Sequence, residues 1–136
     1  MPPDDSTWRL VRCRDGEPAT VRFGGWNCRV VLQSYADGQH PLLRLIDVDD
    51  MASVARATVH LPGAELAEDE LLVKDYAENE GVLEALIAAG LVEPTGRHIS
   101  TECASLDVAR MSDALSRQWI DFRQSLPAAR QGRSRP

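Results

Sequence analysis

Several residue types that often signal a particular function are scarce in this chain. Its 136 residues include one lysine, three histidines and three cysteines, and 5% of them are aromatic. Cys13, Cys28 and Cys103 lie far apart and form no Cys-x-x-Cys pair, so we expect free thiols rather than a disulfide framework. No apolar run approaches the roughly eighteen residues that a membrane span needs, and the start shows no secretory pattern. We therefore expect a cytoplasmic protein without membrane contact.

Sequence motifs for the common catalytic and metal sites are missing as well. The chain has no P-loop, no GxGxxG and no GxSxG motif. His40, His60 and His98 form no helical i, i+4 pair and no zinc-type arrangement with the cysteines. The acidic run at 47–50 lacks the spacing and the terminal glutamate of an EF-hand, so we expect a turn there. The sequence therefore predicts no metal and no cofactor.

Length and hydrophobic pattern predict one α+β domain over residues 1–126, with an antiparallel meander sheet, one packed helix and a C-terminal amphipathic helix. Short turn segments, such as Gly24-Gly25, separate four apolar or alternating runs, which predicts four strands in meander order. The third run is apolar on both faces, so it should be a central strand covered on both sides. The predicted strands are residues 19–23, 27–35, 40–48 and 52–61.

The last of these strands shows a clear alternation. It should bury one face, while Arg56, Thr58 and His60 point the other way. Proline ends the run at Pro62-Gly63 because it has no N–H for the ladder. The residues expected on the buried face are Ala55, Ala57, Val59 and Leu61.

The segment after residue 70 predicts a short strand, 70–74, followed by a helix. Asp75 and Asn79 are equally good N-cap residues, and Glu78 would complete a capping box with Asp75. Gly90 lies where a left-handed residue commonly ends a helix. The apolar stripe of the helix is expected to be Val82, Leu83, Leu86 and Ile87. After the helix, residues 94–96 predict a turn and residues 97–100 predict a last strand.

The C-terminal part predicts an amphipathic helix at 112–126 and a disordered basic tail at 127–136. Leu115, Trp119 and Phe122 lie on one stripe of that helix. They could pack on the chain's own sheet, or they could form a partner or homodimer interface, where aromatic anchors are common. Packing on the sheet is favoured, because a four-stranded sheet with one helix leaves a face uncovered.

Charge is unevenly distributed along the chain, whose net charge is −6. Residues 65–84 hold eight carboxylates against Lys74, while residues 110–136 carry a net charge of +4. Acidic residues near a helix start are favoured by the helix dipole, so capping and solubility explain many of them. The alternative is an acidic surface that docks onto a basic partner. The residues of that expected surface are Glu65, Glu68, Asp69, Glu70, Asp75, Glu78 and Glu80.

Residues 57–97 contain three short motifs in order: a strand ending in TV-LP, then DE---KDY-ENEG, then AG-V--TGR. This pattern resembles the core of a family of small uncharacterised proteins found in phages, plasmids and bacterial genomes. The resemblance implies a setting, the accessory proteins of mobile elements, and it implies no catalytic residue. The matching positions are Leu61, Pro62, Asp69, Glu70, Lys74, Asp75, Tyr76, Glu78, Asn79, Glu80, Gly81, Gly90, Thr95, Gly96 and Arg97.

Together these features favour a non-enzymatic, protein-binding accessory factor of a mobile element, such as an anti-defence (anti-CRISPR-like) inhibitor. Its acidic surface would meet a basic surface of a host protein. One alternative is a small enzyme or enzyme subunit centred on Lys74, Asp75 and Glu80, which would need a desolvated carboxyl group. The other is a nucleic-acid accessory protein that uses the arginines of the tail, although the acidic body opposes phosphate binding.

Overall fold

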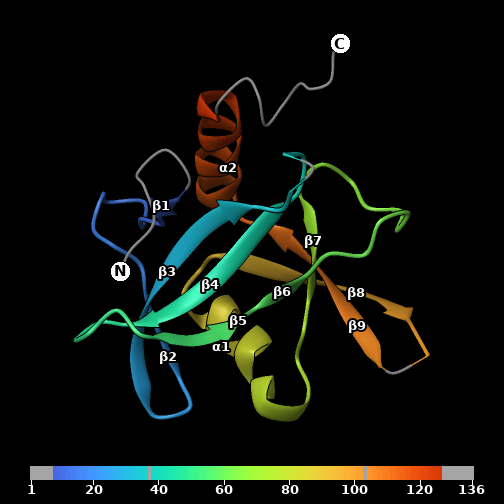
Figure 1. Ribbon diagram of the computed structural model, residues 1–136, viewed down its shortest axis with the longest axis horizontal. Coiled ribbons are helices and arrows are strands. Elements are labelled where there is room, and N and C mark those ends of the chain that lie inside the picture. The colour runs from blue at the N-terminus through green and yellow to red at the C-terminus, as the bar shows by residue number, and fades with distance from the viewer. Residues whose placement is uncertain (1–7, 37, 103, 127–136) are drawn as a thin grey trace.

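Two antiparallel sheets and two α-helices form the fold of the described residues, 8–36, 38–102 and 104–126, in this computed structural model (Figure 1). The predicted α+β class is confirmed. The predicted disordered tail, 127–136, lies outside the described residues. The first sheet contains β1 (Arg9–Leu10), β2 (Thr20–Phe23), β3 (Trp26–Ser34), β4 (Pro41–Asp47) and β5 (Ser53–Arg56). The second contains β6 (Thr58–Val59), β7 (Glu70–Val73), β8 (Val92–Ser100) and β9 (Ser105–Met111), and the helices are α1 (Val82–Ala88) and α2 (Asp113–Ser125).

The first sheet follows the predicted meander. β3 pairs with β4, β4 pairs with β5, and β1 and β2 both pair with β3. Gly24 and Gly25 have φ angles of 60° and 86° and close the β2–β3 hairpin, a conformation that glycine adopts without steric cost. β4 is buried along most of its length, which confirms that it is a central strand covered on both faces.

The predicted single strand 52–61 is divided between the two sheets, at Ala57. The Ala57 N–H donates to the Leu43 carbonyl of β4, and the Ala57 carbonyl accepts from the Lys74 N–H beside β7. The chain therefore leaves the first sheet and enters the second at this residue. Thr58 was expected on the exposed face, but it is buried, because the crossover brings it against Leu43 and Tyr35.

The second sheet has the order β6-β7-β9-β8, with β9 in its interior. The prediction of a turn at 94–96 is wrong, because β8 continues through these residues with a bulge between Pro94 and His98. Gly96 has a φ angle of 80° within this bulge. The sequence-based interpretation also missed β9, which buries apolar residues on both of its faces.

Helix α1 begins later than predicted. A short 3-10 helix, Ala77–Asn79, precedes it, and Gly81 is the N-cap residue. Asp75 still caps the helix, because its Oδ1 accepts from the N–H groups of Gly81 and Leu83 at 2.9 and 3.1 Å. The predicted C-terminal end is confirmed. The Gly90 N–H donates to the Ile87 carbonyl and the Leu91 N–H to the Leu86 carbonyl, which is the Schellman pattern.

Helix α2 packs on the chain's own core. Ser112 caps it by accepting from the Leu115 N–H at 3.2 Å. Leu115, Trp119 and Phe122 are 0%, 2% and 0% exposed and belong to the same hydrophobic cluster as the first sheet and α1. The alternative that these three side chains form a partner or dimer interface is therefore wrong, since they are already buried within one chain. Neither helix of the described residues has the length and apolar character to cross a membrane.

Candidate functional site

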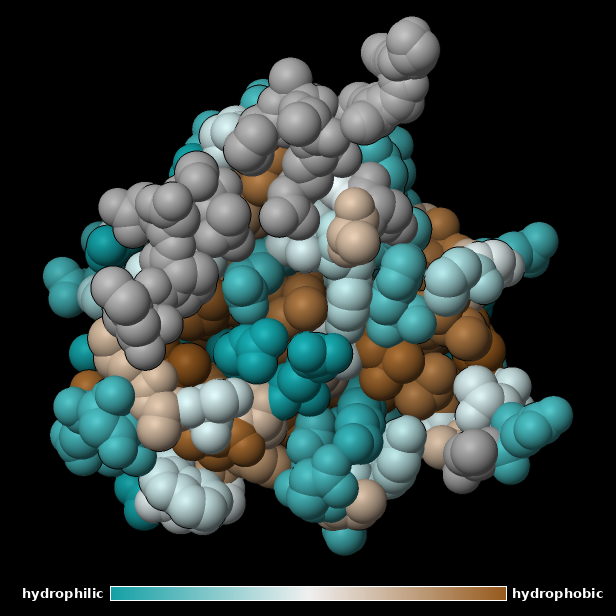
Figure 2. Space-filling view, in the orientation of Figure 1, coloured by the Kyte–Doolittle hydropathy of each residue, from teal (hydrophilic) through white to brown (hydrophobic). Residues whose placement is uncertain are grey.

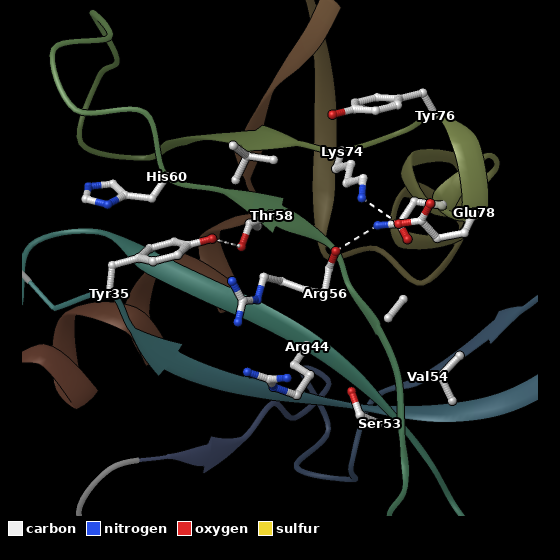
Figure 3. Close-up of a pocket in the computed structure, with 13 residues that line it drawn as sticks. Tyr35, Arg44, Ser53, Val54, Arg56, Thr58, His60, Lys74, Tyr76 and Glu78 are labelled. Atoms are coloured by element: carbon white, nitrogen blue, oxygen red, sulfur yellow. Dashed lines mark hydrogen bonds and ion pairs between the residues drawn. The ribbon is translucent and has the colours of Figure 1, made fainter. Parts of the chain in front are cut away.

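A cleft of about 700 Å³ lies where the chain crosses from the first sheet to the second. Its walls come from the end of β3, from β4, β5 and β6, and from the segment 74–79. Figure 2 shows strongly hydrophilic side chains at the centre of this face, over β4 to β6, between hydrophobic areas on either side. The polar side chains that line the cleft include Tyr35, Arg44, Arg56, Thr58, Lys74 and Glu78 (Figure 3).

Two arginines face each other across the strands at the centre of the cleft. Arg44 on β4 and Arg56 on β5 are register partners, which places their Cβ atoms roughly 5 Å apart on one face of the sheet. The Arg44 Nε donates to the Gln33 Oε1 at 3.2 Å, which orients its guanidinium. Ion pairs in the described part of the chain use other cations, and no carboxylate pairs with Arg44 or Arg56. Like charges directly opposite each other destabilise a sheet, so this pair costs stability unless an anion lies between the two groups.

Hydroxyl groups extend the polar wall beside the two arginines. The Tyr35 hydroxyl lies 3.0 Å from the Thr58 Oγ1, which also accepts from the Leu43 N–H at 3.1 Å. Burial raises the pKa of the Tyr35 hydroxyl, against the opposing effects of Thr58 and the two arginines. The phenol therefore stays protonated at neutral pH and remains a hydrogen-bond donor. Figure 3 shows both guanidinium groups on the side of the cleft where this hydroxyl lies.

The KDY-ENEG motif forms the opposite wall. Lys74 donates to the Glu78 carboxylate, which raises the pKa of the Lys74 amine, and its Nζ lies 5.5 Å from the Tyr76 ring centroid. Asn79 is buried and donates from Nδ2 to the Arg56 carbonyl at 2.7 Å. Together with the bond from the Lys74 N–H to the Ala57 carbonyl, this contact fixes the backbone that carries the Arg56 side chain.

The predicted acidic surface is divided in the structure. Glu65, Glu68 and Asp69 precede β7, while the segment from Asp75 to Glu84 follows it. A strand of four residues separates the two groups by roughly 13 Å at about 3.3 Å per residue. Several carboxylates also have partners within the chain: Asp69 pairs with Arg110, Glu78 pairs with Lys74, and Asp75 caps α1. The eight carboxylates therefore do not form one continuous free surface.

Glu70 does not belong to an exposed surface at all. It is 7% exposed and accepts from the Ala67 N–H at 2.9 Å and from the Arg97 Nη1 at 2.8 Å, with Arg110 at 3.9 Å. The Ala67 hydrogen bond, aided by the two arginines, lowers the pKa of the carboxyl group even though burial opposes that change. The prediction that Glu70 belongs to an exposed acidic surface is therefore wrong, because the side chain is buried and pairs with arginines of the same sheet.

The residues of the enzyme alternative do not converge on a reactive group in this geometry. The Lys74 amine is held by Glu78, the Asp75 carboxylate is held by two backbone N–H groups, and Glu80 is exposed to solvent. In the described residues, no group of three potential His, Cys, Asp or Glu ligands lies close enough to hold a metal ion. Cys28 is buried and Cys13 half-buried, both as free thiols, and Cys103 lies outside the described residues.

Comparisons with protein families, with curated proteins and with solved structures gave no match. The geometry of the cleft is therefore the basis for a function. The residues that the sequence predicted for a binding site did not include Arg44 or Arg56. The signal that could have found them is the predicted hairpin across the turn at 47–50, since its register brings two arginines together.

Proposed function

We propose that this chain is a non-enzymatic binding module, an accessory factor that recognises an anionic group on a partner protein through the cleft. The observation that carries the proposal is the cross-strand pair of Arg44 and Arg56, which has no carboxylate partner in the described residues. Lys74 adds a third cation to the same cleft. Arginine forks match carboxylate and phosphate oxygens in paired geometry, so an anionic group supplies what this arrangement lacks.

A defined probe tests this proposal. We expect a dye-labelled hexaglutamate peptide to bind the wild-type protein in fluorescence anisotropy at low salt, and to bind more weakly at 0.3 M salt as screening increases. The double variant Arg44→Gln, Arg56→Gln should lose at least about tenfold in affinity, because charged hydrogen bonds contribute roughly 1.5–3 kcal/mol each. Its thermal stability should be equal to or higher than that of the wild type, since the substitution relieves the like-charge pair.

The matched control carries the same change in net charge elsewhere on the surface. Arg14 and Arg22 are both exposed and lie outside the cleft, so the double variant Arg14→Gln, Arg22→Gln should retain wild-type affinity. An equal loss in both double variants would mean that the peptide senses only overall charge, and the cleft would then not be the binding site.

The KDY-ENEG resemblance implies a setting among the accessory proteins of mobile elements. In that setting we propose that the chain is an anti-defence inhibitor, which acts by occupying a surface of a host protein. The cleft changes the expected chemistry of contact, because a cationic site selects an acidic region of the partner rather than a basic one.

Docking of a basic partner is a second candidate, limited to one end of β7. Glu68 and Asp69 line a hollow of about 380 Å³ together with Trp119, Ile120 and Arg123, and Ile120 is 42% exposed. Glu68 can meet the charge of a lysine side chain and Ile120 its stem, while Asp69 already pairs with Arg110. A labelled hexalysine peptide should bind the wild type more tightly than the Glu68→Lys variant. Equal affinities of the two proteins for that peptide would exclude the hollow as a docking site.

A further inference from the structure

The charge of the cleft is matched to a dianion. Three cations, Arg44, Arg56 and Lys74, and one carboxylate, Glu78, line it, which leaves a net charge of +2 in a chain whose net charge is −6. A single carboxylate would neutralise only half of this charge. A phosphate monoester carries a charge of about −1.5 to −2 near pH 7 and therefore complements it.

The hydrogen-bonding groups of the cleft point to the same ligand. The two guanidinium groups are donors only, and Gln33 already occupies the Nε of Arg44, which leaves the Nη end of that fork directed into the cleft. The Tyr35 hydroxyl can donate as well when Thr58 donates to it, since either atom of that pair can be the donor. A phosphate monoester offers three terminal oxygens that accept hydrogen bonds, whereas a carboxylate offers two.

The surroundings of the arginines favour a phosphate on a protein chain over a nucleotide. The aromatic rings near the cleft already have partners: Tyr35 stacks on His60 with centroids 4.7 Å apart, and Lys74 lies over Tyr76. A base that stacked on either of these occupied faces would have to displace the contact there. By contrast, the cleft runs along the whole of β5, the end strand of the first sheet, so an extended peptide segment fits beside it.

We infer that the preferred ligand of the cleft is the dianionic phosphate monoester of a phosphorylated side chain on a partner protein, an inference that rests on the proposed function above. Isothermal titration calorimetry with four probes tests it. The probes are a short neutral peptide with one phosphoserine, the same peptide with glutamate at that position, the same peptide with unmodified serine, and adenosine monophosphate.

We expect the phosphoserine peptide to bind at least tenfold more tightly than the glutamate peptide, and the serine peptide not to bind. Arg44→Gln and Arg56→Gln should each remove that preference, whereas Arg22→Gln, an exposed arginine on β2, should preserve it. Thermal melts establish that each variant is folded.

Equal binding of the glutamate and phosphoserine peptides would overturn the phosphate inference and leave the proposed function standing. If adenosine monophosphate bound and the phosphoserine peptide did not, the inference that the phosphate belongs to a protein side chain would be overturned. Failure of all four probes would overturn the phosphate inference, and the proposed function would fall as well only if the hexaglutamate peptide also failed to bind.

Discussion

Replacing Trp119 with alanine is expected to lower the free energy of unfolding by about 3–5 kcal/mol. Trp119 is 2% exposed and lies on α2 between the buried side chains of Leu115 and Phe122, with its ring 6.3 Å from that of Phe122. Alanine would leave a cavity in the core shared by α2 and the first sheet. Because a domain of this size is stable by only about 5–15 kcal/mol, the loss should be plain in urea denaturation followed by circular dichroism.

The adjacent residue on the same helix provides the control. Ile120 is 42% exposed, so Ile120→Ala should stay within about 0.5 kcal/mol of the wild type. A Trp119→Ala protein with an unchanged denaturation midpoint would show that α2 is not part of the core. Size-exclusion chromatography adds an independent test. If Trp119→Ala left stability unchanged but converted a dimer into a monomer, the dimer interpretation rejected above would be restored.

Local signals in the sequence predicted the parts of the fold that depend on neighbouring residues. The glycine pair Gly24-Gly25, the left-handed Gly90 with Leu91 after α1, and the apolar stripe of α2 were all placed correctly, since each depends on contacts within a few residues. The acidic residue Asp75 was also recognised as a cap, although it caps from a position before the 3-10 helix rather than directly at the helix start.

Long-range contacts decided the elements that the sequence did not predict. The crossover at Ala57 depends on Leu43 and Lys74, which lie far along the chain on either side, so the alternation of 52–61 gave no sign of it. β9 was missed because it lies between two hydrophobic clusters. Leu106 and Val108 belong to the smaller cluster, while Ala109 and Met111 belong to the larger one. Burial on both faces removes the alternation by which a strand is recognised.

The candidate site was hidden for a similar reason. The many carboxylates of 65–84 dominate the sequence, but pairing and capping within the chain occupy several of them. The cations of the cleft are spread over three segments, and only the β4–β5 register and the crossover bring Arg44, Arg56 and Lys74 together. The KDY-ENEG motif forms one wall of this cleft through Lys74, Tyr76, Glu78 and Asn79.

The substitution Glu70→Lys is expected to cost more than about 4 kcal/mol and to leave little folded protein, since it buries an unpaired charge. The new ammonium group would lie beside Arg97 and Arg110 in place of the carboxylate that now pairs with them. The Ala67 N–H would lose its acceptor as well. Glu68→Lys makes the same change of charge two residues away at an exposed position, so it should stay within about 0.5 kcal/mol of the wild type. Yield of soluble protein and urea denaturation measure both effects.

The milder variant Glu70→Gln tests the charge of this carboxylate through its pH dependence. Because the folded state lowers the pKa of Glu70 below its ordinary value of 4.5, the charged carboxylate stabilises the fold above about that pH. This contribution is lost as the pH falls through the lowered pKa. The wild type should therefore be more stable than Glu70→Gln at pH 7, and the difference should narrow below pH 4.5. A constant difference across that range would mean that Glu70 acts by shape and neutral hydrogen bonding. Glu70 would then stabilise the second sheet without any contribution from its charge.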